Sequence, residues 1–165
     1  MKDNIDAIYN SYFQDVYYFL LSLCHNHHTA EDLVQETFFR AHLFLESYRG
    51  ENVKTWLFTV AYNAFIDHYR KHKKTVIQEQ DFFTGYVDKK KSVVEEILVR
   101  EEVEEIIASL KDLPEKHKIA VLLSDFHGLT TSEAAKVMNV KQSYFKVLLF
   151  RGRQAIRQRR ESQHE

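Results

Sequence analysis

The chain has 165 residues, of which 44% are hydrophobic and 28% are charged, and its formal net charge is −1. This balance is typical of a globular protein with one ordinary domain or two small ones, and it excludes a disordered chain. Four glycines, one proline and one cysteine leave few turn residues and no internal disulfide, so we expect an all-α fold.

The amino-terminal stretch predicts two helices. Apolar residues recur at steps of three and four over residues 4–24, which is the pattern of an amphipathic helix. The sequence HNHH then breaks the pattern. Thr29 and Asp32 have the spacing of a capping box, in which a hydroxyl accepts from a free backbone N–H at the helix start, so we expect the second helix over residues 30–46. Cys24, at the end of an apolar run, is interpreted as a small core residue.

A third helix is expected over residues 53–72, after a break at Gly50, because its apolar residues form one stripe. From His72 to Lys91 the helical period is lost, which favours a flexible linker. The predicted organisation is a domain over 1–74, a linker over 75–91 and a second domain over 92–165.

The second domain is expected to begin with an acidic helix. Ser92 and Glu95 have the spacing of a capping box, and the helix should end near Pro114. A further helix over 115–127 should end at Gly128, a good left-handed C-cap residue. The acidic residues from Glu101 to Glu105 are interpreted as a solvated helix face, with contact to a basic partner as the alternative.

The segment that follows predicts a helix-turn-helix. Thr130 and Glu133 supply a third capping box for a short helix over 131–138. Asn139 is the expected turn residue, because Asn tolerates the left-handed conformation. On the second helix, three apolar residues recur on the side expected to face inward: Val140, Phe145 and Leu149.

The end of the chain is basic and favours nucleic acid as the partner of this motif. Between positions 141 and 165 there are seven Lys and Arg residues and two Glu residues. A recognition helix of this kind enters the major groove of duplex DNA. Base edges should be read by Gln142, Ser143, Tyr144 and Lys146, and phosphates neutralised by Arg151, Arg153 and Arg157. The alternative is a helical hairpin with a solvated basic face.

Aromatic and basic residues alternate between residues 48 and 74, which suits unpaired bases as well as phosphate. The rings are Tyr48, Trp56, Phe58, Tyr62 and Tyr69, and the cations are Arg49, Lys54, Arg70, Lys71, Lys73 and Lys74. The alternative for each ring on the apolar stripe is a place in the core.

Four blocks in order carry a family resemblance that covers nearly the whole chain. They are AEDLVQETFFRA (30–41), YRGENVKTWLFTVAYNAFIDHYRK (48–71), LPEKHKIAVLLSDFHGLTTSEAAKVMNV (113–140) and FKVLLFRGRQAIR (145–157). Together they resemble a small sigma factor of the extracytoplasmic-function group. The resemblance implies two helical domains joined by a linker, binding to bacterial RNA polymerase and promoter DNA, and no catalytic chemistry.

The resemblance also implies three sets of site residues. The residues implied to dock on the beta-prime clamp helices of core polymerase are Asp32, Leu33, Gln35, Glu36, Phe39 and Arg40. Those implied to capture the melted minus-ten strand are Tyr48, Arg49, Glu51, Asn52, Lys54, Trp56, Asn63 and Arg70. Those implied to read the minus-thirty-five duplex are Thr130, Lys141, Gln142, Ser143, Tyr144, Lys146, Arg151 and Arg153. Further implied partners are the beta flap of polymerase and an anti-sigma factor.

Some positions depart from the family pattern. Lys141 stands where Ser or Thr is common, Val147 and Leu148 where Ser-Arg is common, and Tyr62 where Arg is common. These departures concern individual promoter contacts and leave the expected architecture unchanged.

Two other function classes are the alternatives to a sigma factor. A stand-alone helix-turn-helix regulator would bind duplex operator by itself, usually as a symmetric dimer. A metallohydrolase would need a metal at His25, His27, His28, Glu31 and Asp32, whose spacing matches no closed ligand set. We therefore expect no metal, no cofactor and no small-molecule substrate. The chain lacks an apolar run of about 18 residues and a signal-peptide pattern, so we expect a cytoplasmic protein, held at the membrane only through an anti-sigma factor.

Overall fold

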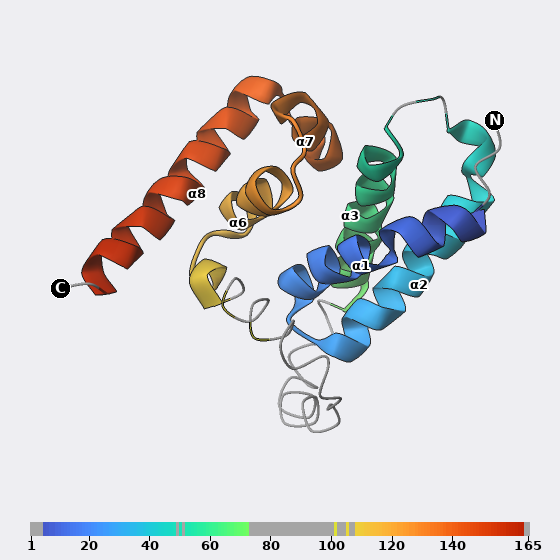
Figure 1. The fold of residues 1–165 in the computed structure, drawn as a ribbon, viewed down its shortest axis with the longest axis horizontal. Coiled ribbons are helices and arrows are strands. Elements are labelled where there is room, and N and C mark those ends of the chain that lie inside the picture. The colour runs from blue at the N-terminus through green and yellow to red at the C-terminus, as the bar shows by residue number, and fades with distance from the viewer. Residues whose placement is uncertain are drawn as a thin grey trace. The chain divides into compact units, whose positions relative to one another are not determined.

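The computed structural model describes residues 5–48, 50, 52–72, 101, 105 and 108–163. Every regular element in this part of the chain is a helix, which confirms the all-α prediction. The chain divides into two compact units, Met1–Arg100 and Glu101–Glu165, and each is described by itself (Figure 1).

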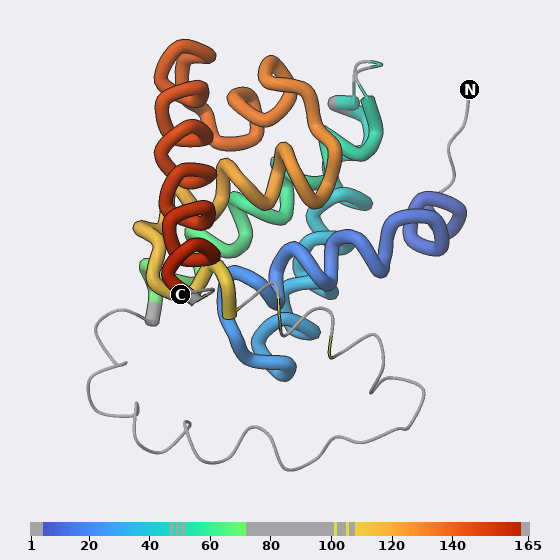
Figure 2. Tube along the Cα trace, turned by 60° about the vertical axis from the view of Figure 1, so that its left-hand side comes forward, coloured from blue at the N-terminus to red at the C-terminus, as the bar shows by residue number. Residues whose placement is uncertain are grey.

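The first unit is built on three long helices: α1 (Ile5–Cys24), α2 (His27–Leu43) and α3 (Val53–His72). The helices pack against one another, as the blue, cyan and green segments of Figure 2 show. Their apolar faces meet in a core in which the Phe19 and Phe58 rings stack with centroids 4.8 Å apart. The predicted bounds of α1 and α3 are confirmed to within one residue.

The predicted start of α2 at a Thr29 capping box was wrong. The helix begins three residues earlier, at His27, because Asn26 is the N-cap and its side-chain oxygen accepts from Thr29 N at 3.0 Å. Only His25, with a φ of 56°, and Asn26 separate the two helices. Cys24 beside this turn is half-buried and not a core residue as expected, and its thiol lies 3.5 Å from the Asn26 carbonyl oxygen.

Residues 44–52 connect α2 to α3. α2 ends at Leu43 rather than residue 46, and a 3₁₀ turn, η1 (Leu45–Ser47), follows it. Gly50 has a φ of 88°, a value that glycine adopts readily. The Asn52 side-chain oxygen then accepts from Lys54 N at 2.9 Å and from Thr55 N at 3.2 Å, and so caps the start of α3.

The second unit contains α6 (Glu115–Val121), which continues into a π-helical turn, η3 (Leu122–Phe126), followed by α7 (Thr131–Met138) and α8 (Gln142–Gln163). The predicted helix over 115–127 is therefore confirmed, with a wider last turn. Gly128 follows with a φ of 72°. α8 packs against α6 and α7 (Figures 1 and 2).

The helix-turn-helix prediction is confirmed in its local details. Thr130 Oγ1 accepts from Glu133 N at 3.1 Å, and Glu133 Oε1 accepts from Thr130 N at 2.9 Å, which completes the capping box. Asn139 takes the left-handed conformation with φ 58° and ψ 48°. Ala134 and Ala135 are buried, as expected of small residues where helices approach closely.

The predicted linker and most of the predicted acidic helix lie outside the described residues. Glu101 and Glu105 are exposed, in agreement with a solvated face at these two positions. Leu110 and Leu113, just before Pro114, are buried in the second unit.

Candidate functional site

The exposed face of α8 holds the residues predicted to read DNA. Gln142, Ser143, Tyr144 and Lys146 are all exposed in the first turns of the helix, and Arg151 and Arg157 are exposed further along. Lys141, just before the helix, is exposed as well. Phe145, Leu148 and Leu149 are buried on the opposite face, so they hold the helix to the rest of the unit.

A close approach between α6 and α8 sets which side of α8 faces outward. A Cβ on Gly152 would lie 2.6 Å from Val121 Cγ2 and 3.0 Å from the His117 carbonyl oxygen. No larger residue fits there without displacement, and Val121 is itself buried. The glycine therefore lets the two helices touch along their backbones, which fixes the rotation of α8 about its axis.

Two of the arginines on α8 are held by carboxylates of the same unit. Arg153 donates to Asp125 at 2.6 Å and 3.0 Å, and the hydrogen bonds to this carboxylate raise the pKa of the guanidinium above its ordinary value. Arg159 lies 3.1 Å from an Asp112 oxygen and donates to the Ser109 carbonyl oxygen at 3.1 Å. Lys146, Arg151 and Arg157 form no ion pair within the part of the chain that the structure describes.

Two of the predicted DNA-contacting residues have partners within the second unit. Thr130 is exposed, and its hydroxyl is used in the capping box of α7. The Tyr144 ring lies under the Lys116 ammonium, 5.8 Å from nitrogen to centroid, which is within the range of a cation–π contact.

The predicted polymerase-docking residues of α2 divide into exposed and buried ones. Asp32 and Gln35 are exposed, and Phe39 leaves 58% of its surface to solvent, an unusual exposure for a phenyl ring. Leu33 is only 4% exposed. Leu33 therefore belongs to the core of the first unit and does not reach this surface, because it lies on the side of α2 that packs against the other helices.

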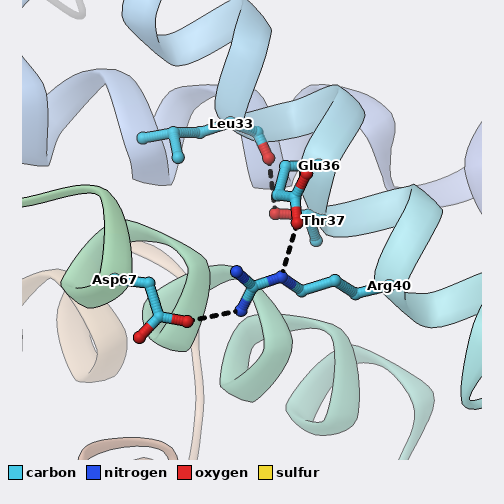
Figure 3. Close-up of polar contacts among 5 residues, drawn as sticks. All are labelled: Leu33, Glu36, Thr37, Arg40 and Asp67. Carbon is cyan, nitrogen blue, oxygen red and sulfur yellow. Dashed lines mark hydrogen bonds and ion pairs between the residues drawn. The ribbon is translucent and has the colours of Figure 1, made fainter. Parts of the chain in front are cut away.

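The remaining two docking residues form an ion-pair chain that joins α2 to α3 (Figure 3). Arg40 Nε donates to Glu36 at 2.7 Å, and Arg40 Nη1 lies 3.0 Å from Asp67 Oδ2 of α3. The hydrogen bond that Arg40 donates to Glu36, followed by its contacts with Asp67, raises the pKa of Arg40. Arg40 is thus a link between helices as well as part of the surface.

Two exposed apolar residues near Phe39 were missed in the sequence. Leu43 and Phe44 are both more than half exposed. Leu43 follows Phe39 by four residues, a spacing that places both side chains on one face of a helix. That spacing was the available signal, but the second helix was expected to bury its apolar residues.

The segment predicted to capture a DNA strand is described in part, since Arg49 and Glu51 lie outside the described residues. The Tyr48 and Trp56 rings are in contact, with centroids 5.3 Å apart and an angle of 56°. The Lys54 ammonium lies 5.9 Å from the centroid of Phe58. Asn52 and Asn63 are exposed, as is Arg70 near the end of α3.

The described residues contain no candidate metal site and no candidate membrane span. No group of His, Cys, Asp and Glu side chains among them could hold a metal ion. His27 instead contacts the Tyr17 hydroxyl through Nδ1, 2.5 Å away. None of the described helices is long and apolar enough to cross a membrane.

Comparisons with known proteins match both units. The family described as Sigma-70 region 2 matches residues 8–75, and the family described as Sigma-70, region 4 matches residues 103–156. The ECF RNA polymerase sigma factor SigM of Bacillus subtilis (strain 168) is 41% identical over 154 residues, which cover 93% of each chain. The RNA polymerase sigma factor YlaC of the same strain is 30% identical and covers 92% of this chain and 89% of its own.

Solved structures show the same fold. The sigma factor RpoE of Bartonella quintana, solved with the anti-sigma factor NepR, has a TM-score of 0.75 at 23% identity, over 93% of this chain and 94% of that chain. CnrH, solved with the cytosolic domain of CnrY, has a TM-score of 0.71 at 17% identity, over 96% and 88%.

Proposed function

The chain belongs to the extracytoplasmic-function group of RNA polymerase sigma factors, and we propose how its two units divide the work of initiation. The first unit docks on core polymerase through α2 and captures the melted minus-ten strand near the start of α3. The second unit reads the minus-thirty-five element as duplex through α8.

The proposal that the second unit reads duplex DNA rests on the exposed face of α8. This face presents polar side chains in its first turns and, along its length, the cations Lys146, Arg151 and Arg157, which form no ion pair with any other described residue. Polar groups at the start of a recognition helix contact base edges, and cations beside them contact phosphates. Lys141, directly before α8, and Thr130, at the start of α7, are also exposed and extend the contact to the DNA backbone.

The strand-capture proposal is supported by the contact between the Tyr48 and Trp56 rings and by the exposure of Asn52 and Asn63. An aromatic ring covers the face of an unpaired base, and an amide pairs with its edge. A base inside an intact stack cannot reach these groups, and extruding it costs a few kcal/mol. Melted DNA is therefore the expected ligand. Lys54 and Arg70 add positive charge for the phosphates.

The docking proposal is supported by the surface of α2 that we name the α2 face: Asp32, Gln35, Glu36, Phe39, Arg40 and Leu43. Exposed carboxylates around an apolar centre are complementary to a basic coiled coil, such as the beta-prime clamp helices. Phe39 and Leu43 would be buried on binding. Leu33 lies on the buried side of α2, in the core of the first unit.

The protein acts in the cytoplasm as a specificity subunit, and neither unit is an enzyme. The beta flap of polymerase contacts the second unit. An anti-sigma factor restrains the protein when it is inactive, as the complexes of RpoE with NepR and of CnrH with CnrY suggest by analogy of fold.

The decisive experiment is transcription from a random promoter library by purified core polymerase, with and without this protein. We expect selected promoters to share two sequence elements and to require both the protein and core enzyme. Tight sequence-specific binding of the isolated protein to duplex DNA, as a symmetric dimer and without polymerase, would instead favour a stand-alone regulator.

A further inference from the structure

Two apolar side chains lie in the middle of the exposed face of α8. Val147 is 41% exposed and Phe150 is 64% exposed. Ser143, Val147 and Phe150 are spaced by four and three residues, so they form one row along the helix. The buried residues Phe145 and Leu149 occupy the opposite side. Solvent therefore meets apolar groups at the centre of the face that carries the predicted DNA contacts.

Cations lie on both sides of this row. Successive residues advance by about 100° around an α-helix, which puts Arg151 to one side of the row and Lys146 and Arg157 to the other. All three are exposed and form no ion pair among the described residues. The row itself holds two apolar side chains, Val147 and Phe150, between the polar residues Ser143 and Gln154. A solvated helix face would instead be polar throughout.

The arrangement matches the major groove of DNA in both charge and polarity. Phosphates form the two walls of the groove, which is about 12 Å wide, and base edges form its floor. Most groups on the floor are hydrogen-bond donors or acceptors, and the thymine C5-methyl is the apolar one. Thymine is therefore the base that offers an apolar group to Val147 and Phe150.

We propose that Val147 is a specificity-determining residue that contacts the C5-methyl group of a thymine in the minus-thirty-five element. Val147 is favoured over Phe150 because it lies nearer the start of α8, where recognition helices approach base edges most closely. The close approach at Gly152 holds this side of the helix outward. The proposal rests on the proposed reading of duplex DNA by α8.

The test uses the complete protein bound to core polymerase and a promoter selected from the random library. Each thymine of its minus-thirty-five element is replaced in turn by deoxyuridine, which removes only the methyl group. At one thymine the parent should bind about fourfold more weakly, the effect of one buried methyl group. Val147→Ala should bind the thymine probe more weakly, by about the same factor, and should show no further loss with deoxyuridine.

Two variants serve as controls. Val140→Ala makes the same chemical change in the turn before α8, where the side chain is half-buried, and should keep the parent's loss with deoxyuridine. Phe150→Ala distinguishes the contribution of Phe150 from that of Val147, and it should also keep the parent's loss of affinity with deoxyuridine.

The contrary results are distinct. A methyl effect that survives Val147→Ala, or that disappears with Phe150→Ala alone, would overturn the assignment to Val147. The assignment would also be wrong if the minus-thirty-five element is required but contains no thymine, or if deoxyuridine at every thymine leaves binding unchanged. The proposal that α8 reads duplex DNA would not be affected by either result. Binding and transcription that do not depend on the minus-thirty-five sequence would remove the proposed function itself.

Discussion

Asp125 holds Arg153 by two hydrogen bonds, with Arg153 Nη2 2.6 Å from Oδ1 and Nε 3.0 Å from Oδ2. The carboxylate lies on the π-helical turn η3, and the guanidinium lies on α8. Such a bidentate pair uses the same fork of N–H groups that would bind a phosphate. Arg153 is therefore a link between η3 and α8, whereas Arg151 remains available for DNA.

The first prediction separates these two arginines by salt dependence. Arg151→Ala should lower promoter affinity and reduce the slope of log affinity against log salt by about one unit, because one phosphate contact is lost. Arg153→Ala should leave the slope unchanged. Asp125→Ala provides the matched control, since it frees Arg153 and should steepen the slope. Equal slopes for both arginine variants would contradict the assignment.

The second prediction concerns the contact between α6 and α8. Gly152→Ala should lower the free energy of unfolding of the second unit by about 1–3 kcal/mol, because the new methyl group meets Val121 and the His117 backbone. Urea unfolding followed by circular dichroism measures this loss. Trp56 is the one tryptophan and lies in the first unit, so its fluorescence transition should not move. Gln154→Ala, at an exposed position of α8, is the control and should unfold as the parent does.

The third prediction concerns the left-handed turn residue Asn139. Asn139→Ala should destabilise the second unit by about 1 kcal/mol, since a Cβ without a polar group disfavours this conformation. Asn139→Gly should be neutral or slightly stabilising. The same urea titration compares the two variants. If alanine and glycine had the same effect, backbone conformation would not be what selects Asn at this turn.

The fourth prediction distinguishes the docking surface from the core beneath it. Phe39→Ala should reduce co-purification with core polymerase and leave the fluorescence transition of the first unit unchanged, because the ring is exposed. Leu33→Ala should lower the free energy of unfolding by about 2–5 kcal/mol, as expected for a cavity in a core. Normal polymerase binding by Phe39→Ala combined with Leu43→Ala would exclude the α2 face as the docking surface.

The fifth prediction concerns strand capture at the start of α3. Asn52 caps this helix, so Asn52→Ala should cost about 1 kcal/mol of stability in addition to any loss of DNA binding. Asn52→Asp keeps an acceptor for the cap and removes the amide donor. With core polymerase present, both variants should bind duplex promoter more weakly than the parent.

Premelted probes identify the step that is affected. A bubble at the minus-ten element should partly rescue both Asn52 variants, because the cost of unpairing has already been met. Fluorescence anisotropy on single-stranded, duplex and bubble probes measures this difference. Equal affinity of the parent for single strand and duplex, with no sequence preference on either, would leave only a basic surface.

Local chemistry accounts for the parts of this protein that its sequence determined. The capping box of Thr130 and Glu133 and the turn at Asn139 each depend on groups within four residues, so α7 and its turn residue were predictable to the residue. Val140 was expected on the second helix, but it lies in the turn, because α8 begins at Gln142. The bounds of α3 follow in the same way from its apolar period. The start of α2 was misjudged because Asn26 and Thr29 are both good N-caps, and periodicity alone does not choose between them.

Contacts between distant segments decided the rest. Leu33 and Phe39 are apolar residues of one helix, and only the packing of α2 on its neighbours buries one and exposes the other. Arg153 was predicted to contact phosphate, but its carboxylate partner lies 28 positions away along the chain, beyond the reach of any helical spacing rule. Val147 and Phe150 face outward because Gly152 seats α8 against α6, a contact that exists only once the two helices have packed.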